Sequence, residues 1–166
     1  DVNFSGIIGG AGANQNNVAL VKSSAGTLSL SGQNTYTGNT TVSAGTLLLA
    51  DNARLNFEIG ASGVNNSIGG TATLTLDGDF TFDLTGAATN GTWTIVNVGT
   101  LTETFGSTFS VVGFTDNGDN TWTKINGGGT YTFTESTGVL SAVPEPSATV
   151  LILGAAVARG DGWDAA

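Results

Sequence analysis

The sequence has 166 residues, a length that fits one domain with a continuous hydrophobic core. Charged residues make up only 10% of it and hydrophobic residues 39%, which excludes an intrinsically disordered chain. The net charge is −9, and the four basic residues are scattered, which argues against nucleic acid or an anionic membrane surface as a partner. These four residues are Lys22, Arg54, Lys124 and Arg159.

The N-terminal part of the sequence contains an internal repeat. Residues 25–30 (AGTLSL) recur at residues 44–49 (AGTLLL), and a looser copy follows at residues 70–76. One such repeat is too short to bury its own apolar face, so that neighbouring copies must stack to form a shared core. With 26 glycines and about as many threonines, the composition favours short strands joined by tight turns. We therefore expect an all-β fold, a parallel β-helix (β-solenoid) domain over residues 1–142.

Strand signals continue in the second half of the chain, although the repeat becomes less clear. Apolar and polar residues alternate with a period of two in five segments, which predicts half-buried strands. These segments are residues 73–76, 80–84, 92–95, 121–123 and 130–134. Between them stand the turn dipeptides Asp77-Gly78, Asn90-Gly91, Asn117-Gly118 and Asn126-Gly127. Because these dipeptides form hairpins as well as the corners of a coil, the second half is either a continued β-helix or an antiparallel sheet.

The C-terminal stretch, residues 143–166, differs from the rest. Two prolines at 144 and 146 interrupt the strand pattern, and residues 147–158 are then almost entirely apolar. A bilayer-spanning helix needs about 20 apolar residues, so this dozen gives no stable membrane span. The length suits a packed helix or an added strand.

Residues 30–47 (LSGQNTYTGNTTVSAGTL) resemble the autotransporter-associated β-strand repeat. The Asn-Thr-Tyr-Thr-Gly core and the Ala-Gly-Thr-Leu end carry this resemblance, and residues 3–10 resemble the segment that often precedes such a repeat, so the resemblance covers residues 3–50. It implies a right-handed parallel β-helix that is exported to or beyond the surface of a bacterial cell. It implies no catalytic residues.

A second resemblance is to the PEP-CTERM sorting signal. It is carried by Val143, Pro144, Glu145 and Pro146 with the apolar run that follows. In that family the run is a membrane span with a basic tail, whereas here the run is short and Arg159 stands alone before Asp161 and Asp164.

The residue types present give no indication of catalysis. Without His or Cys, the usual hydrolytic triads, Cys nucleophiles and His-rich metal sites are excluded. Asp77, Asp79, Asp116 and Asp119 could offer oxygen ligands to Ca²⁺, but their spacing matches no known calcium loop, and Asp is also a common turn residue. We expect solvated turns, no resident cofactor and no enzyme activity.

Threonines and aromatic residues each allow two interpretations. Regularly spaced threonines on a flat face can bind ice, but the Thr-x-Thr pairs are unevenly spaced in the sequence and suit outward strand positions. A set of aromatic residues could stack on sugars, although their alternation with Thr favours a place in the core. The set comprises Phe82, Trp93, Trp122, Tyr131 and Phe133.

These observations indicate a secreted or cell-surface structural protein. A solenoid exposes unpaired backbone groups at its ends, and a second copy can pair with them head to tail, giving a filament or surface layer. We expect the contact to use apolar residues of both ends, namely Phe4, Ile7, Ile8, Val150, Leu151, Ile152, Leu153 and Trp163. The alternatives are a monomeric surface adhesin or matrix module that binds extracellular polysaccharide and, less favoured, an ice-binding protein.

Overall fold

The computed structural model describes residues 1–12, 14–99 and 104–146, and within these residues the fold is all-β with no helix. Sixteen strands lie in four sheets, three of them parallel and one antiparallel. The predicted all-β class is therefore confirmed. None of the described residues forms a helix with the length and hydropathy needed to cross a membrane.

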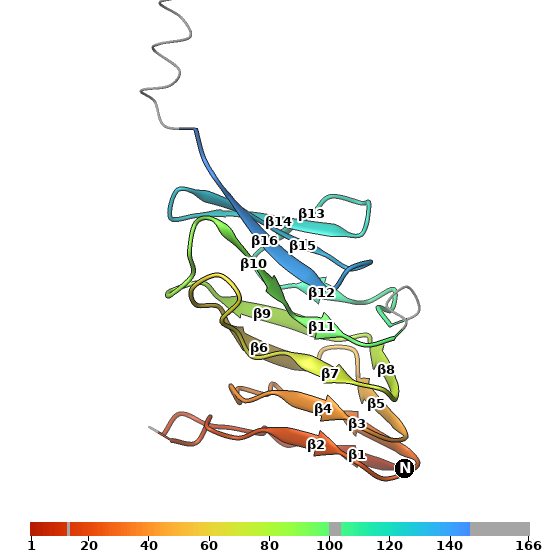
Figure 1. Cartoon of the computed structure of the whole chain (residues 1–166). Helices are drawn as coiled ribbons and strands as arrows, with labels where there is room; N and C mark the ends of the chain where they lie inside the picture. The colour runs from red at the N-terminus through yellow and green to blue at the C-terminus, as the bar shows by residue number, and fades with distance from the viewer. Residues whose placement is uncertain (13, 100–103, 147–166) are drawn as a thin grey trace, which may run out of the picture.

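In each parallel sheet, neighbouring strands come from successive passages of the chain (Figure 1). The first sheet consists of β1 (Val2–Phe4), β3 (Thr27–Leu30), β5 (Thr46–Leu49) and β8 (Thr73–Leu76). The second consists of β2 (Leu20–Lys22), β4 (Thr40–Val42), β7 (Ile68–Gly70) and β11 (Val96–Asn97). The third consists of β6 (Arg54–Glu58), β9 (Asp79–Asp83) and β12 (Ser110–Val111).

The sequence repeat sets the register of the first sheet. Thr27 lies opposite Thr46, and Thr46 lies opposite Thr73, so all three copies of the repeat align residue by residue. Leucines at the same positions of the copies are buried on the inner face, because side chains alternate between the two faces of a strand. Stacking of the copies was predicted from the repeat, and the register confirms it.

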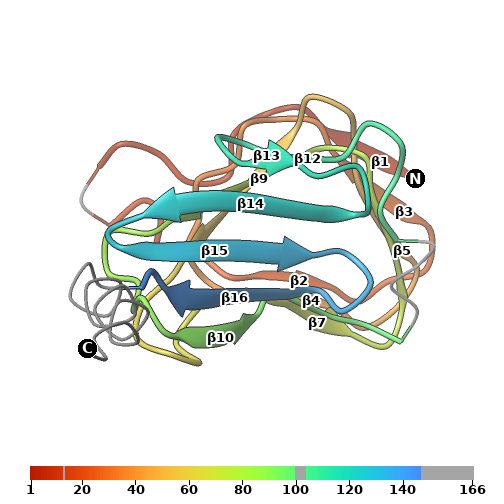
Figure 2. The same cartoon turned by 90° about the horizontal axis from the view of Figure 1, so that it is seen from above.

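The antiparallel sheet, called the cap sheet below, lies across the last turn of the chain (Figures 1 and 2). Its strands in spatial order are β10 (Gly91–Thr94), β16 (Val139–Pro144), β15 (Gly129–Thr134), β14 (Thr121–Asn126) and β13 (Thr115–Asp116). Of the two arrangements left open for the second half, the antiparallel one holds for these strands, whereas β11 and β12 extend the parallel sheets. Asn117-Gly118 lies in the hairpin loop between β13 and β14, and Asn126 ends β14 just before the Gly127-Gly128 turn to β15. Asp77-Gly78 forms a corner between two sheets.

Aromatic side chains join the cap sheet to the parallel sheets. Phe80 of β9 lies 5.0 Å from Phe109 and 5.9 Å from Phe133 of β15, measured between ring centroids. Trp93 and Tyr131 stack inside the cap with ring centroids 6.1 Å apart. The aromatic residues predicted for the core are buried there, except Trp122, which is half-buried against it.

Gly45 forms a corner at which two successive turns of the chain approach closely. Its φ angle is +71°, and a methyl group there would overlap the backbone carbonyl oxygen of Gly26 and meet that of Ser24 at 2.5 Å. Lys22 spans the same corner, since its buried Nζ donates to the carbonyl oxygens of Ser24 and Ala44. The corner therefore requires glycine both for its backbone conformation and for its lack of a side chain.

We expect Gly45→Ala to lower the free energy of unfolding by at least ~1 kcal/mol more than Gly118→Ala. Both glycines have a positive φ angle, and this strain costs each alanine variant about 1–2 kcal/mol. Only Gly45 has backbone atoms in the space of the new methyl group, since nothing lies within 4 Å of that space at Gly118. Urea unfolding of the two variants measures the difference, and equal losses would contradict close approach of the turns.

Candidate functional site

The outer face of the third parallel sheet carries a set of aligned polar side chains. On β6 and β9 the inner positions are buried aromatic or leucine side chains, and the outer positions are all polar. Because the two strands are in register, the outer side chains form three neighbouring pairs. The pairs are Arg54 with Asp79, Asn56 with Thr81, and Glu58 with Asp83.

The segment 33–37 continues this polar face under β6. Gln33 bridges to Arg54 in parallel register, and Asn34 points inward, where it is buried. The Asn34 amide accepts a hydrogen bond from the backbone N–H of Ile8 at 3.0 Å and donates to the carbonyl oxygens of Gly32 and Arg54 at 3.0 and 3.1 Å. One side chain thus links three turns of the chain and fixes the position of the segment.

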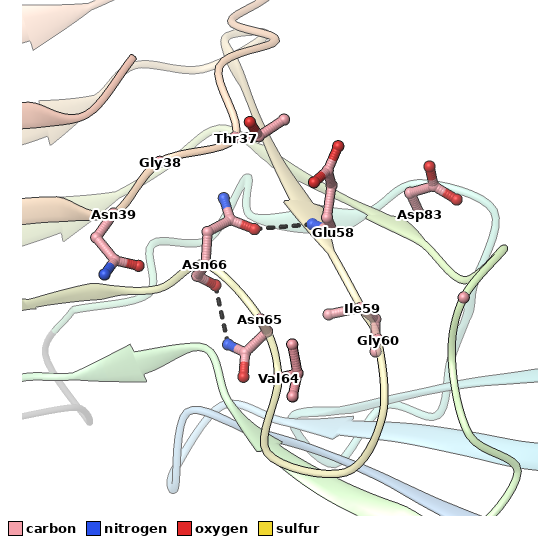
Figure 3. Close-up of a pocket in the computed structure, with 11 residues that line it drawn as sticks. Thr37, Gly38, Asn39, Glu58, Ile59, Gly60, Val64, Asn65, Asn66 and Asp83 are labelled. Atoms are coloured by element: carbon pink, nitrogen blue, oxygen red, sulfur yellow. Dashed lines mark hydrogen bonds between the residues drawn. The ribbon is translucent and has the colours of Figure 1, made fainter. Parts of the chain in front are cut away.

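Two adjoining hollows of about 530 and 380 Å³ lie along this face, and we call them together the side groove. They share Thr37, Glu58 and Asp83. Figure 3 shows the larger hollow, in which the carboxylates of Glu58 and Asp83 extend to the same side. Its wall is the loop between β6 and β7, which Asn66 holds by accepting from the Glu58 N–H at 2.8 Å and donating to the Asn56 carbonyl at 2.9 Å.

The charges of the side groove are mixed. The Arg54 guanidinium lies 3.6 Å from the Asp79 carboxylate, measured from Nη2 to Oδ2, and Asp79 also accepts from the Ser110 hydroxyl at 2.5 Å. Hydrogen bonds from the Thr85 side chain and from its backbone N–H hold the pKa of Asp83 below the usual aspartate value. The acceptors Glu58 and Asp83 thus lie at one end of the paired strands, and the donor Arg54 lies at the other.

We expect Thr85→Val to raise the pKa of Asp83 toward the ordinary aspartate value. The hydroxyl bond favours the charged carboxylate, and the variant removes it while the backbone N–H remains. With its pKa depressed in the fold, Asp83 contributes stability above its unfolded pKa and loses it as the pH falls through the folded pKa. An NMR titration of the Asp83 carboxyl carbon measures the shift, with Thr132→Val in the cap sheet as the control. An unchanged Asp83 titration in Thr85→Val would contradict the assignment.

The aspartates considered for calcium lie in two separate places. Asp79 lies next to the side groove, where it pairs with Arg54. Asp77 is two residues earlier in the chain, and its carbonyl oxygen accepts from the Thr108 hydroxyl at 2.8 Å. Asp116 and Asp119 bond within the hairpin of β13 and β14, to the N–H of Gly118 at 2.8 Å and to the hydroxyl of Thr121 at 2.6 Å. Across the described ranges, no three His, Cys, Asp or Glu residues are grouped to hold a metal ion.

The predicted assembly residues divide between described and undescribed parts of the chain. Phe4 and Ile7 belong to the N-terminal end of the structure, which contains β1 and β2 and is called the first layer below. Their side chains are 42% and 58% exposed, and Ile8 is half-buried. The remaining predicted contacts lie outside the described residues, and they are Val150, Leu151, Ile152, Leu153 and Trp163.

The predicted sorting motif begins inside the cap sheet. Val143 is exposed and Pro144 ends β16, opposite Gly129 of β15. Glu145 follows and donates its N–H to the Gly128 carbonyl at 2.9 Å, and Pro146 is the last described residue. The apolar run after the motif lies outside the described residues.

The structure aligns threonines that are unevenly spaced in the sequence. Thr123 lies opposite Thr132, Thr132 opposite Ser141, and Ser141 opposite Thr92, so that a row of hydroxyl side chains crosses four strands of the cap sheet. They lie on the outer face, since Trp93, Tyr131 and Phe133 fill the inner one. The sequence could not show this row, because strand order in the cap sheet differs from chain order.

Sequence reasoning missed β6 and with it the side groove. β6 lies outside the sequence repeat. Its partner β9 was predicted as a strand, but no pairing strand was assigned to it. The signal was present, since Leu55, Phe57 and Ile59 alternate with polar residues in the period of a strand.

Two comparisons relate the chain to known proteins. The model of the passenger-associated-transport-repeat family matches residues 20–49, which include β2 to β5. The adhesin BmaC autotransporter of Brucella suis biovar 1 (strain 1330) is 39% identical over 122 residues. That alignment covers 70% of this chain but only 4% of the adhesin. No solved structure matches the chain.

Proposed function

This chain is an autotransporter-associated repeat protein, and from this we propose an extracellular or cell-surface role of the adhesin type. Within that role, we propose a β-solenoid subunit that joins others head to tail into a filament or surface layer. The family match and the named adhesin support the location and the non-enzymatic role. The observation that supports this assembly is that β1 and β2 of the first layer stand at the ends of their sheets.

The order of the strands supports the solenoid interpretation. The chain runs from β5 in the first sheet to β6 in the third and β7 in the second, and then returns to β8 in the first. In the next turn it passes through β8, β9 and β11 in the same order of sheets, with β10 inserted from the cap sheet. Repeated passage through three sheets in a fixed order is how the coils of a parallel β-helix are formed.

The first layer offers two strand edges for a further coil. β1 and β2 stand at the ends of their sheets, and each pairs with one neighbour among the described strands. Apolar side chains are exposed on and near these strands, namely Val2, Phe4, Ile7, Val18 and Val21. Unpaired backbone groups next to apolar side chains are the features that bind an added strand.

The opposite end has a different surface, so the contact we propose is heterologous. The cap sheet covers that end, and the chain leaves it after β16 (Figures 1 and 2). We propose that the segment 143–166 of one copy, in the part that follows β16, supplies the strand or helix that docks on the first layer of the next. Each subunit then has one donor end and one acceptor end, which yields an open chain of subunits.

We expect Val21→Lys to prevent assembly and Val64→Lys to leave it unchanged. The two valines have similar exposure, 63% and 61%, but only Val21 lies on the first layer. A lysine there would place a charge beside the docking edge, as natural edge strands do to block pairing. Electron microscopy and multi-angle light scattering measure the polymers, and filaments of equal length in both variants would contradict this interface. Removal of residues 147–166, which leaves β16 intact, tests the donor, and unchanged filaments would exclude that segment.

A monomeric adhesin or matrix module that binds polysaccharide is the second candidate function. The side groove favours it, because the groove offers aligned hydroxyl, amide and carboxylate groups. We do not favour ice binding, since adjacent strands of a sheet rotate by about 20–25° and the threonine row on the cap sheet therefore lacks the flatness of an ice plane.

A further inference from the structure

We propose that the side groove binds a segment of neutral polysaccharide, with sugar hydroxyls held by Arg54, Asn56, Thr81 and the carboxylates of Glu58 and Asp83. The proposal rests on the polysaccharide-binding function and not on head-to-tail assembly. It names the site and the chemical class of the ligand. Both are inferred from the polar groups of the groove and from those among them that lack a hydrogen-bond partner.

Two buried atoms of the groove have no hydrogen-bond partner. Across the described residues, the buried side-chain nitrogen and oxygen atoms without a partner are Nε of Arg54 and Oγ1 of Thr81. Both residues line the smaller hollow, and they lie on neighbouring strands one outer position apart. Buried polar atoms nearly always have partners, because a missing one costs free energy. A sugar hydroxyl that reaches this pair can accept from Nε and also pair with the threonine hydroxyl.

The neighbouring groups are already arranged by the fold. Thr35 donates its hydroxyl to the Asn16 side chain at 2.8 Å, and Thr37 donates to the Asn16 carbonyl at 3.1 Å. These bonds fix the lower wall, while Asn66 fixes the loop above. The side groove is therefore preformed, as binding sites for small molecules usually are.

The charges select a neutral ligand. A polyanion would meet Glu58 and Asp83 in the part shared by both hollows, and the single guanidinium of Arg54 lies beside Asp79. An ammonium group carries only donors, and so the amino position of a cationic sugar cannot serve as the acceptor for Nε of Arg54. Hydroxyl groups donate and accept, and they therefore satisfy the carboxylates and the orphan donor together.

The dimensions suit a chain of sugars more than a single one. The hollows of about 530 and 380 Å³ each fall within the range of ~300–1,000 Å³ typical of ligand sites. They adjoin at Thr37, Glu58 and Asp83, so a ligand that fills both passes over the paired residues of β6 and β9.

The test is calorimetric titration of the full chain with cellotetraose, maltotetraose and mannotetraose as neutral probes. Tetragalacturonate and a chitosan tetramer are the acidic and cationic comparisons. We expect at least one neutral tetrasaccharide to bind, and to bind at least tenfold more tightly than either charged probe.

Two variants locate the site. Thr81→Val removes the orphan hydroxyl, and Arg54→Lys keeps the positive charge near Asp79 but removes Nε. Each should weaken binding of the neutral probe at least fivefold, whereas the control Thr132→Val in the cap sheet should not. Thr81→Val should also unfold at the same or a higher urea concentration than the wild type, because a buried hydroxyl without a partner is lost.

Three results would overturn the proposal. If no neutral probe binds, both the groove as a site and the polysaccharide-binding function fail, with head-to-tail assembly unaffected. If a neutral probe binds and neither Thr81→Val nor Arg54→Lys weakens it, the function stands and the groove is not its site. Tighter binding of a charged probe would exclude the neutral ligand class.

Discussion

The spacing between successive turns of the chain is the constraint on which the structure depends. Hydrogen-bonded strands stand about 4.8 Å apart, so the corners that connect them must approach as closely as the strands do. Gly45 lies against the carbonyl of Gly26, and Gly70 lies against that of Val42. A side chain at either corner would separate two turns and break the pairing on both sides of it. The high glycine content thus reflects the stacking of turns more than the flexibility of loops.

Backbone groups at the corners also need hydrogen-bond partners. Polar side chains supply them. Asn34 and Lys22 each bond to backbone groups from different segments, and Asn66 bonds to two backbone groups of β6. Lys22 is buried although it is charged, and its Nζ binds carbonyl oxygens. The asparagines of this chain therefore act as internal connectors as well as turn residues.

Some of this architecture could be predicted from sequence, and the limits have physical reasons. The AGTL repeat predicted the first sheet, because identical residues at identical corners require identical register. Alternating aromatics predicted the core, since strand periodicity does not depend on which strand is the neighbour. The pairing of Arg54 with Asp79 and of Glu58 with Asp83 could not be predicted, because β6 and β9 share no sequence similarity that reveals their register. The side groove is a product of that pairing.

Turns of unequal length share one register in this chain. The aligned residues Thr27, Thr46 and Thr73 show that the second interval is longer than the first, and much of the difference lies in the loop between β6 and β7. That loop forms a wall of the side groove while the strands beside it keep their pairing. Insertions and deletions can therefore accumulate in the loop without disturbing the core. Related chains could in this way acquire differently shaped grooves on an unchanged scaffold, and diversify what they recognise faster than how they fold.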